Sequence, residues 1–274
     1  MKQFLLIIKK IFSSPLDILF LRIVGYHKPY RVAFLRLLTI VFKKFRPHFH
    51  SALYEIALEA KELNITEISV IEFGVAGGNG LLSIEKYCKK ISKKLSVKFK
   101  IYGFDLGDGK GLPISNDSND INYFWSSGDF KMNENKLRKK IKSSELILGD
   151  IKKTLPIFLE NKNIPPIGAI FFDLDFYSST KESFRIFEIN QNFRLPRIKC
   201  YFDDIQPPSN NFNSIFKAIN EFNVSQKNKK IVKPSGSTLD YKYGPWNEEF
   251  YEFHDFKHDK YNNKIFKTII LTEL

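Results

Sequence analysis

Acidic and glycine residues follow the apolar segments of this sequence, and they are the residues best suited to chemistry. They are Glu72 with Gly74, Asp105, Gly149 with Asp150, Asp173 with Asp175, and Asp203 with Asp204. In an open α/β sheet, ligands bind outside the carboxyl ends of the strands. If each apolar segment is a strand, these side chains lie along one edge of a sheet and form a ligand site there.

Two of these positions carry paired carboxylates. Asp173 and Asp175 follow an apolar run and lie on the same side of a strand end, because side chains alternate along a strand. Asp203 and Asp204 end the next apolar segment. Grouped carboxylates are costly unless a cation neutralises them, and Mg²⁺ prefers oxygen ligands. We therefore expect a divalent metal site, although one acid of each pair could instead cap a helix.

A glycine-rich turn, VIEFGVAGGNG at 70–80, follows the first apolar segment. Its glycines do not have the G-x-G-x-x-G spacing of nicotinamide-dinucleotide sites. The pattern E-x-G-x-A-x-G from Glu72 to Gly78 fits an S-adenosylmethionine site better, with Ala76 where a glycine is usual. Asp105 ends the second predicted strand and is placed to accept hydrogen bonds from a ribose diol. Nicotinamide dinucleotides and S-adenosylmethionine both require such an acid, so Asp105 does not discriminate between these two cofactors.

The elements that must position these residues alternate from residue 50 onward. The pattern predicts strands at 67–73, 97–105, 144–150, 168–175 and 199–205 and helices at 50–63, 80–95, 151–162, 179–189 and 211–223. This order is typical of a mostly parallel sheet with helices on both faces. Residues 106–130 form a long loop, a length typical of lids and binding loops. Segments 229–233, 248–253 and 267–274 are candidate strands, and two of them pair as a terminal antiparallel hairpin.

The sequence resembles the macrocin O-methyltransferase type, a family of metal-dependent S-adenosylmethionine enzymes that methylate sugar hydroxyls. The resemblance covers roughly residues 68–206 and rests on IEFGVAGG, YGFDLGDGKGLP, FWSSGDF, LGDIKKTLP, FFDLDFYSST and YFDDI. The D-x-D-x-Y-x-S-T run that begins at Asp173 is the most specific of these, together with the later aspartate pair. The resemblance implies a class I methyltransferase fold, Rossmann-like, with a mostly parallel seven-stranded sheet.

Carried over residue by residue, the resemblance implies a role for each candidate. Asp173, Asp203 and Asp204 would ligate Mg²⁺ or another divalent cation, and Asp175 would be the general base. The cofactor would contact Glu72, Gly74, Ala76, Gly78, Asp105, Gly149, Asp150 and Ile151, with Glu72 and Gly74 at its methionine end, Asp105 at its ribose, and Asp150 and Ile151 at its adenine. Trp125 and residues 126–130 would belong to a lid. This chain lacks the Gly-Gly that family members usually carry before the last acidic strand.

Positive charge is concentrated at the N-terminus. The chain has a formal net charge of +13, and residues 1–50 hold ten lysines and arginines against the single acid Asp17. We expect a basic helical extension at 1–50 and a methyltransferase domain at 51–274. No apolar run approaches the ~20 residues of a membrane span, and no signal peptide is evident. Three alternatives are open for this extension: it packs on the main domain, it rests on anionic lipid, or it forms a dimer arm.

These patterns favour an S-adenosylmethionine-dependent O-methyltransferase that acts on a sugar or a glycosylated small molecule. Cys88 and Cys200 have neither disulfide nor zinc spacing, which suits a reducing cytoplasm, with contact at the inner membrane face as an alternative. We expect a saccharide or other small-molecule acceptor and no nucleic acid, while homo-oligomerisation stays open. Three rival hypotheses are a Rossmann oxidoreductase, a metal-dependent phosphoesterase, and a non-catalytic fold relative in surface-polysaccharide assembly.

Overall fold

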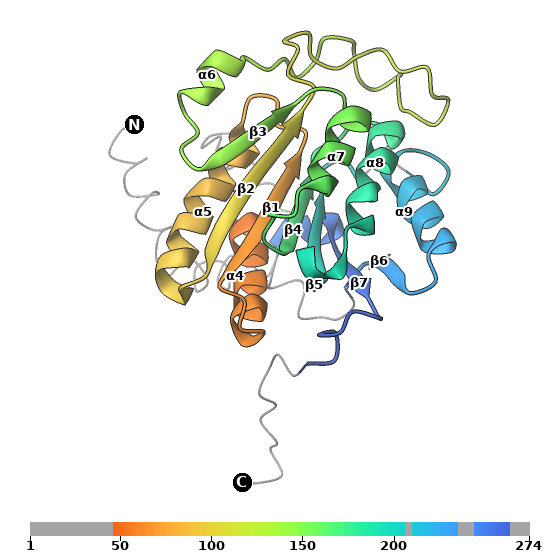
Figure 1. Cartoon of the computed structure of the whole chain (residues 1–274). Helices are drawn as coiled ribbons and strands as arrows, with labels where there is room; N and C mark the ends of the chain where they lie inside the picture. Colours follow the sequence, from red (N-terminus) through yellow and green to blue (C-terminus); the bar gives the residue numbers. More distant parts are fainter. Residues whose placement is uncertain (1–45, 206–209, 235–243, 264–274) are drawn as a thin grey trace, which may run out of the picture. The chain divides into compact units, whose positions relative to one another are not determined.

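Seven strands form one sheet in the order β3-β2-β1-β4-β5-β7-β6 (Figure 1). A computed structural model describes residues 46–205, 210–234 and 244–263. β7 runs antiparallel to both of its neighbours, and the other paired strands are parallel. The strands are β1 (Glu67–Phe73), β2 (Lys98–Asp105), β3 (Ser144–Leu148), β4 (Ile167–Phe172), β5 (Arg194–Phe202), β6 (Lys229–Val232) and β7 (Phe250–Asp255).

The central strands are apolar because both faces of the sheet are covered. Every residue of β4 is buried, as are all residues of β1 after Glu67. Such continuous apolar runs are typical of parallel strands that lie between two layers of helices. The predicted terminal hairpin forms between the segments 229–233 and 248–253. The third candidate strand, 267–274, lies outside the described residues.

Helices cover the two faces of the sheet in two groups (Figure 1). One group is α4 (Pro47–Glu62) and α5 (Asn79–Leu95), and the other is α7 (Ile151–Glu160), α8 (Tyr177–Ser183) and α9 (Ser214–Ser225). A short helix, α6 (Glu134–Arg138), precedes β3, and 3₁₀ turns lie at Phe184–Glu188, Gln191–Phe193 and Gly244–Glu249. The predicted helix 179–189 is therefore divided between α8 and the 3₁₀ turn that follows it.

Aromatic side chains fill the core on both faces. On the face of α7, α8 and α9, the ring of Phe172 stacks on Phe202 with centroids 4.6 Å apart, and Phe187 stacks on Phe253 at 4.3 Å. On the other face, the ring centroids of Phe49 in α4 and Phe171 in β4 lie 4.2 Å apart. Adjacent β4 residues thus serve opposite cores, as the strand alternation requires.

Helix α4 begins three residues before its predicted start at His50. Pro47 occupies the first turn, where a missing backbone N–H costs nothing, and Arg46 is the N-cap. Residues 46–50, assigned from the sequence to the basic extension, therefore begin the first helix of the main unit, 46–274. The rest of the predicted extension, 1–45, lies outside the described residues. Within the described part of the chain, the helices are too short or too polar to cross a membrane.

Candidate active site

A cavity of about 570 Å³ opens at the carboxyl ends of the parallel strands. Its wall comes from the turn after β1, the ends of β2, β4 and β5, and the start of α7, with Trp125 and Phe130 from the long loop. Most of the predicted site residues lie on this wall: Gly74, Ala76, Asp105, Gly149, Asp150, Ile151, Asp173, Asp175, Asp203 and Asp204. Residues up to 130 positions apart in the sequence thus share one concave site.

The glycine-rich turn passes very close to the end of β4. Gly74 has a φ of +85°, and a Cβ at this position would lie 1.8 Å from the backbone oxygen of Asp173. Only glycine fits, because both the positive φ and the contact exclude a side chain. The Gly74 N–H donates to the carbonyl of Phe104 at 2.8 Å, so the turn is fixed between β2 and β4.

Asp105 holds the glycine-rich turn in place. Its Oδ2 accepts hydrogen bonds from the backbone N–H groups of Val75 and Ala76 at 2.9 and 2.8 Å, and its Oδ1 accepts from Gly107 at 2.9 Å. A carboxylate offers about four lone-pair positions, so Asp105 can still accept from a ligand. The predicted ribose contact stays a prediction, and the structure adds a second task for this residue.

Glu72 lies behind the turn instead of on the cavity wall. The side chain is 1% exposed, accepts from the backbone of Leu81, and sits against Gly80, where a Cβ would lie 1.7 Å from Oε1. Its Oε2 has no hydrogen-bond partner among the described residues. Burial first, and then the charges of Asp203 and Asp105, raise the pKa of Glu72 to about 8. The predicted contact with the cofactor stays a prediction.

Two further predicted cofactor residues have structural tasks. Gly78 is the N-cap of α5 with a φ of +81°, is not among the described residues that line the cavity, and would place a Cβ 2.2 Å from Leu137. Asp150 is the N-cap of α7, and its side chain accepts from the N–H of Lys152 at 2.9 Å. Capping therefore explains Asp150 without a ligand, although its place on the wall keeps the adenine contact as a prediction.

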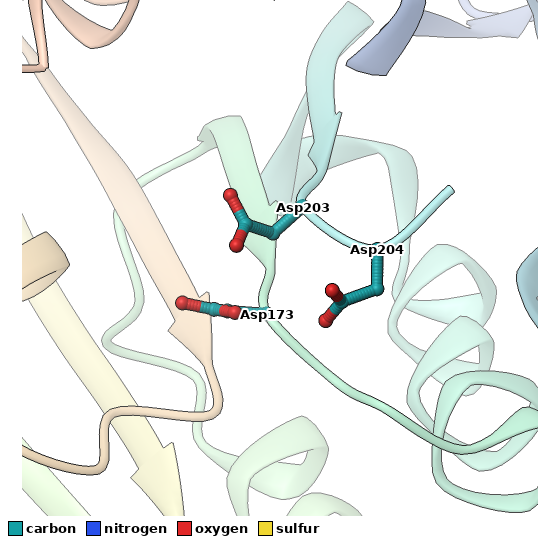
Figure 2. Close-up of side chains that lie close together, drawn as sticks. All are labelled: Asp173, Asp203 and Asp204. Carbon is teal, nitrogen blue, oxygen red and sulfur yellow. The ribbon is translucent and has the colours of Figure 1, made fainter. Parts of the chain in front are cut away.

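Three aspartates from two strand ends converge in the cavity. One carboxylate oxygen each from Asp173, Asp203 and Asp204 lies within 4.8 Å of the other two, and Figure 2 shows the three side chains around a common space. The backbone N–H of Asp173 donates to Phe73, and that of Asp203 donates to Phe172, so both positions are fixed by the sheet. These are the three acids that the resemblance implies as metal ligands, and metal binding by them stays a prediction.

Asp175 is held beside this group and not within it. β4 ends at Phe172, so the strand alternation invoked for Asp173 and Asp175 does not operate there. Asp175 instead lines the cavity through the loop before α8 and hydrogen-bonds Asp204.

The electrostatics of the cluster favour either shared protons or a bound cation. Burial, followed by the charge of Asp203, raises the pKa of Asp173, and the same two causes raise the pKa of Asp204 to about 8. Burial is also the largest cause that raises the pKa of Asp175 to about 7. An all-oxygen set of carboxylates with these pKa values suits a hard divalent cation, whose charge would keep the acids ionised.

Arg46 is a residue of this site that sequence reasoning missed. Its Nη1 lies 3.5 Å from Oδ1 of Asp203, the same oxygen that accepts a 2.5 Å hydrogen bond from Tyr201. Arg46 also lines the cavity. The sequence offered no signal for this, because Arg46 is one of ten basic residues in its first fifty.

The long loop after β2 is anchored at its middle. Asp120 is buried and accepts from the N–H of Ser178 at 2.9 Å and from its hydroxyl at 2.7 Å. Ser178 belongs to the acidic motif that follows β4, so the loop and the motif are joined. Trp125 and Phe130, both predicted for a lid, come from the part of this loop beyond the anchor and reach the cavity.

The strand order identifies the fold. A mostly parallel sheet in which the last strand, β7, is inserted antiparallel between β5 and β6 is the Rossmann-like arrangement called the class I methyltransferase fold. The chain has the class I methyltransferase fold. No family model matches it, and no curated protein sequence matches it.

Solved structures of methyltransferases resemble the chain at low identity. The calicheamicin methyltransferase CalS11 is 18% identical with a TM-score of 0.49, covering 74% of this chain and 77% of that one. Apo CalS11, described as a TDP-rhamnose 3'-O-methyltransferase, is 16% identical with a TM-score of 0.43, covering 74% and 78%. The plantazolicin methyltransferase BpumL, solved with S-adenosylhomocysteine, is 11% identical with a TM-score of 0.36, covering 76% and 82%.

Proposed function

We propose that this chain is an S-adenosylmethionine-dependent O-methyltransferase that acts on a hydroxyl of a sugar or glycosylated small molecule with the help of a divalent cation. The observation that carries the proposal is the meeting of two sites in one cavity. The glycine-rich turn and Asp105 form one wall, and Asp173, Asp203 and Asp204 form another. A methyl donor and a cation-bound hydroxyl could therefore lie side by side.

The residues of the cavity fit both S-adenosylmethionine and a divalent cation. S-adenosylmethionine carries a positively charged amino group at its methionine end, and the carboxylates on the cavity wall would complement it, with the buried Glu72 adding to them from behind the turn. The cavity volume of about 570 Å³ is typical of small-molecule and cofactor sites. The three aspartates supply the carboxylate oxygens that Mg²⁺ prefers, and Asp173 and Asp204 gain from a cation because their pKa values are raised.

The chemistry divides between the bound groups and the side chains. S-adenosylmethionine supplies the methyl group when bound, and a divalent cation lowers the pKa of a coordinated hydroxyl. Asp175, which lies on the cavity wall beside Asp204, would take the proton of the acceptor hydroxyl. Asp105 keeps the turn in shape, and Trp125 and Phe130 exclude water from one side.

The direct test is isothermal titration with S-adenosylhomocysteine and, separately, with NAD⁺, each with and without Mg²⁺. We expect binding of S-adenosylhomocysteine alone, weakened more than about tenfold in Asp105→Asn, because the new amide N–H₂ would face the turn's N–H donors. Glu145→Gln, the same kind of change on an exposed side chain of β3, is the matched control and should bind normally.

The rival hypotheses predict other results in this experiment. NAD⁺ binding would indicate an oxidoreductase, and binding of neither ligand would leave the phosphoesterase and the non-catalytic relative. An acceptor screen with sugars follows only if S-adenosylhomocysteine binds. Methylation of an acceptor that survives in Asp175→Asn would remove the general-base role from Asp175.

A further inference from the structure

Arg46 places a positive charge against the acidic cluster. Its Nη1 lies 3.5 Å from Oδ1 of Asp203, and its charge also acts on Asp173, Asp204 and Glu72. Among the described residues on the cavity wall, the other basic side chain is Lys131, which belongs to the long loop. The acidic cluster thus has one positively charged side chain beside it, that of Arg46.

The fold holds Arg46 in this position. Arg46 is the N-cap of α4, and its carbonyl accepts from the N–H of Phe49 at 3.0 Å. A hydrogen bond joins its backbone to the hydroxyl of Tyr87 on α5. Its guanidinium carbon lies 5.2 Å from the centroid of the Phe49 ring, which restricts the side chain further.

Asp203 belongs to two groupings at once. One of its oxygens meets Asp173 and Asp204 within 4.8 Å, and its Oδ1 faces Arg46 and accepts from the hydroxyl of Tyr201. A metal ion held by the three aspartates would therefore share Asp203 with a guanidinium. Two cations on one carboxylate repel each other, and an arginine does not lose its charge in a protein.

We propose that Arg46 is the resident counter-cation of the acidic cluster and that a divalent ion binds there against its charge, so that Arg46 lowers the affinity of the site for metal. This inference rests on the metal site of the proposed function. Without an ion, Arg46 offsets part of the repulsion among the aspartates. With an ion, it keeps binding weak and reversible.

The test is isothermal titration calorimetry, in which Mn²⁺ is added to the full chain at fixed pH and ionic strength. Arg46→Met and Arg46→Gln should bind Mn²⁺ at least about tenfold more tightly than the original chain, because the repelling charge is gone. Arg46→Lys keeps the charge and should stay within about threefold. Asp203→Asn should abolish binding in either background, because it removes a ligand oxygen's charge.

The matched control is Arg185→Met. It removes the same charge from a side chain that pairs with Glu182 on the surface, and it should leave the Mn²⁺ affinity unchanged. Circular dichroism and thermal melting of each variant establish that it is folded. Arg46→Gln retains hydrogen-bond donors toward Asp203, so it separates the effect of charge from that of a lost contact.

Parallel titrations with S-adenosylhomocysteine separate this inference from the proposed function. Unchanged or weaker Mn²⁺ binding in both neutral variants would overturn the inference. So would a loss of S-adenosylhomocysteine affinity with unchanged Mn²⁺ affinity, which would place Arg46 on the cofactor. If neither the original chain nor Arg46→Met binds Mn²⁺ while S-adenosylhomocysteine binds, the inference and the metal site fail together, and the methyltransferase assignment stands.

Discussion

At the scale of single residues, the glycine-rich turn is shaped by contacts that leave no room for a Cβ. At Gly74 the contact is with backbone, the carbonyl of Asp173, which cannot turn aside as a side chain can. Since Asp173 is a predicted metal ligand, the same contact fixes the turn and the first acid of the cluster relative to each other. The predicted cofactor turn and the first predicted metal ligand are therefore joined by one backbone contact.

Gly74→Ala should destabilise the protein by about 2 to 4 kcal/mol, from the positive φ and the overpacking together. Gly77→Ala is the control, because a Cβ at Gly77 meets nothing within 4 Å. Urea unfolding of both variants measures the free energies of unfolding. Equal losses in the two variants would show that the contact at Gly74 is not the cause.

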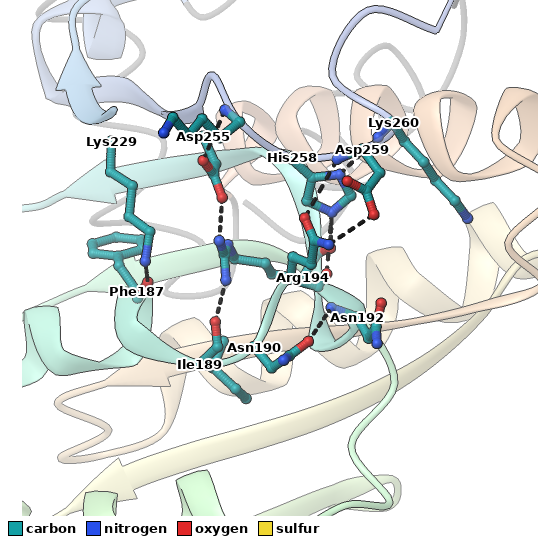
Figure 3. Close-up of polar contacts among 12 residues, drawn as sticks. Phe187, Ile189, Asn190, Asn192, Arg194, Lys229, Asp255, His258, Asp259 and Lys260 are labelled. Carbon is teal, nitrogen blue, oxygen red and sulfur yellow. Dashed lines mark hydrogen bonds and ion pairs between the residues drawn. The ribbon is translucent and has the colours of Figure 1, made fainter. Parts of the chain in front are cut away.

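At the scale of secondary-structure elements, a buried ion pair fastens the start of β5 to the end of β7 (Figure 3). Arg194 donates to Asp255 and to the carbonyl of Ile189, and both charged side chains are at most 6% exposed. His258 adds to this end of the sheet, because its Nε2 lies 3.1 Å from the carbonyls of Gln191 and Arg194. The antiparallel β7 is thus joined to β5 through polar side-chain contacts as well as through backbone pairing.

Asp255→Asn should lower the free energy of unfolding by about 3 to 5 kcal/mol, because it leaves the buried Arg194 charge uncompensated. Glu182→Gln, which breaks the exposed pair with Arg185, should cost less than about 1 kcal/mol. Denaturant unfolding compares them. A small loss of unfolding free energy in Asp255→Asn would mean that Arg194 finds another partner. The affinity for S-adenosylhomocysteine should be unchanged in both variants.

At the scale of the whole molecule, an ion-pair network links one helical layer to the sheet. Lys199 of β5 pairs with Glu252 of β7 and, at 2.8 Å, with Glu55 of α4. Nε2 of His254 lies 3.3 Å from the second oxygen of Glu252. Burial would raise the pKa of Glu252, but the hydrogen bond with His254 and the charge of Lys199 lower it to about 2.

The pH dependence of stability should report this network. The folded pKa of Glu252 lies below its ordinary value, so its contribution is complete above about pH 4.5 and is lost as the pH falls toward 2. Glu252→Gln should destabilise the protein at pH 7, and its deficit should shrink by about 1.4 kcal/mol at pH 3.5. Urea unfolding at both pH values measures this. If the loss of unfolding free energy in Glu252→Gln is the same at both pH values, the pKa of Glu252 is not lowered in the folded protein.

The sequence by itself determined the fold class and most of the acids of the site. Apolar segments that end in acids or glycines occur in few architectures, because parallel strands must be buried on both faces and their carboxyl ends share one edge. The alternation of strands and helices and the gathering of acids at one edge of the sheet followed from this local pattern, whereas the resemblance supplied the set of Asp173, Asp203 and Asp204, and which candidate strands pair at the end of the chain stayed open. The cofactor, the acceptor and the role of residues 1–45 stay predictions.

Only the tertiary structure decided which residues face the cavity and which support it. Glu72 lies behind the turn, Gly78 caps α5 away from the cavity wall, and Asp105 holds the turn's N–H groups. Asp175 reaches the site from a loop. Arg46 enters the site from a segment whose sequence indicates only basic charge. Such placements depend on how α4 and the loops pack against the sheet. Packing joins residues far apart in the chain, so neither periodicity nor spacing encodes it.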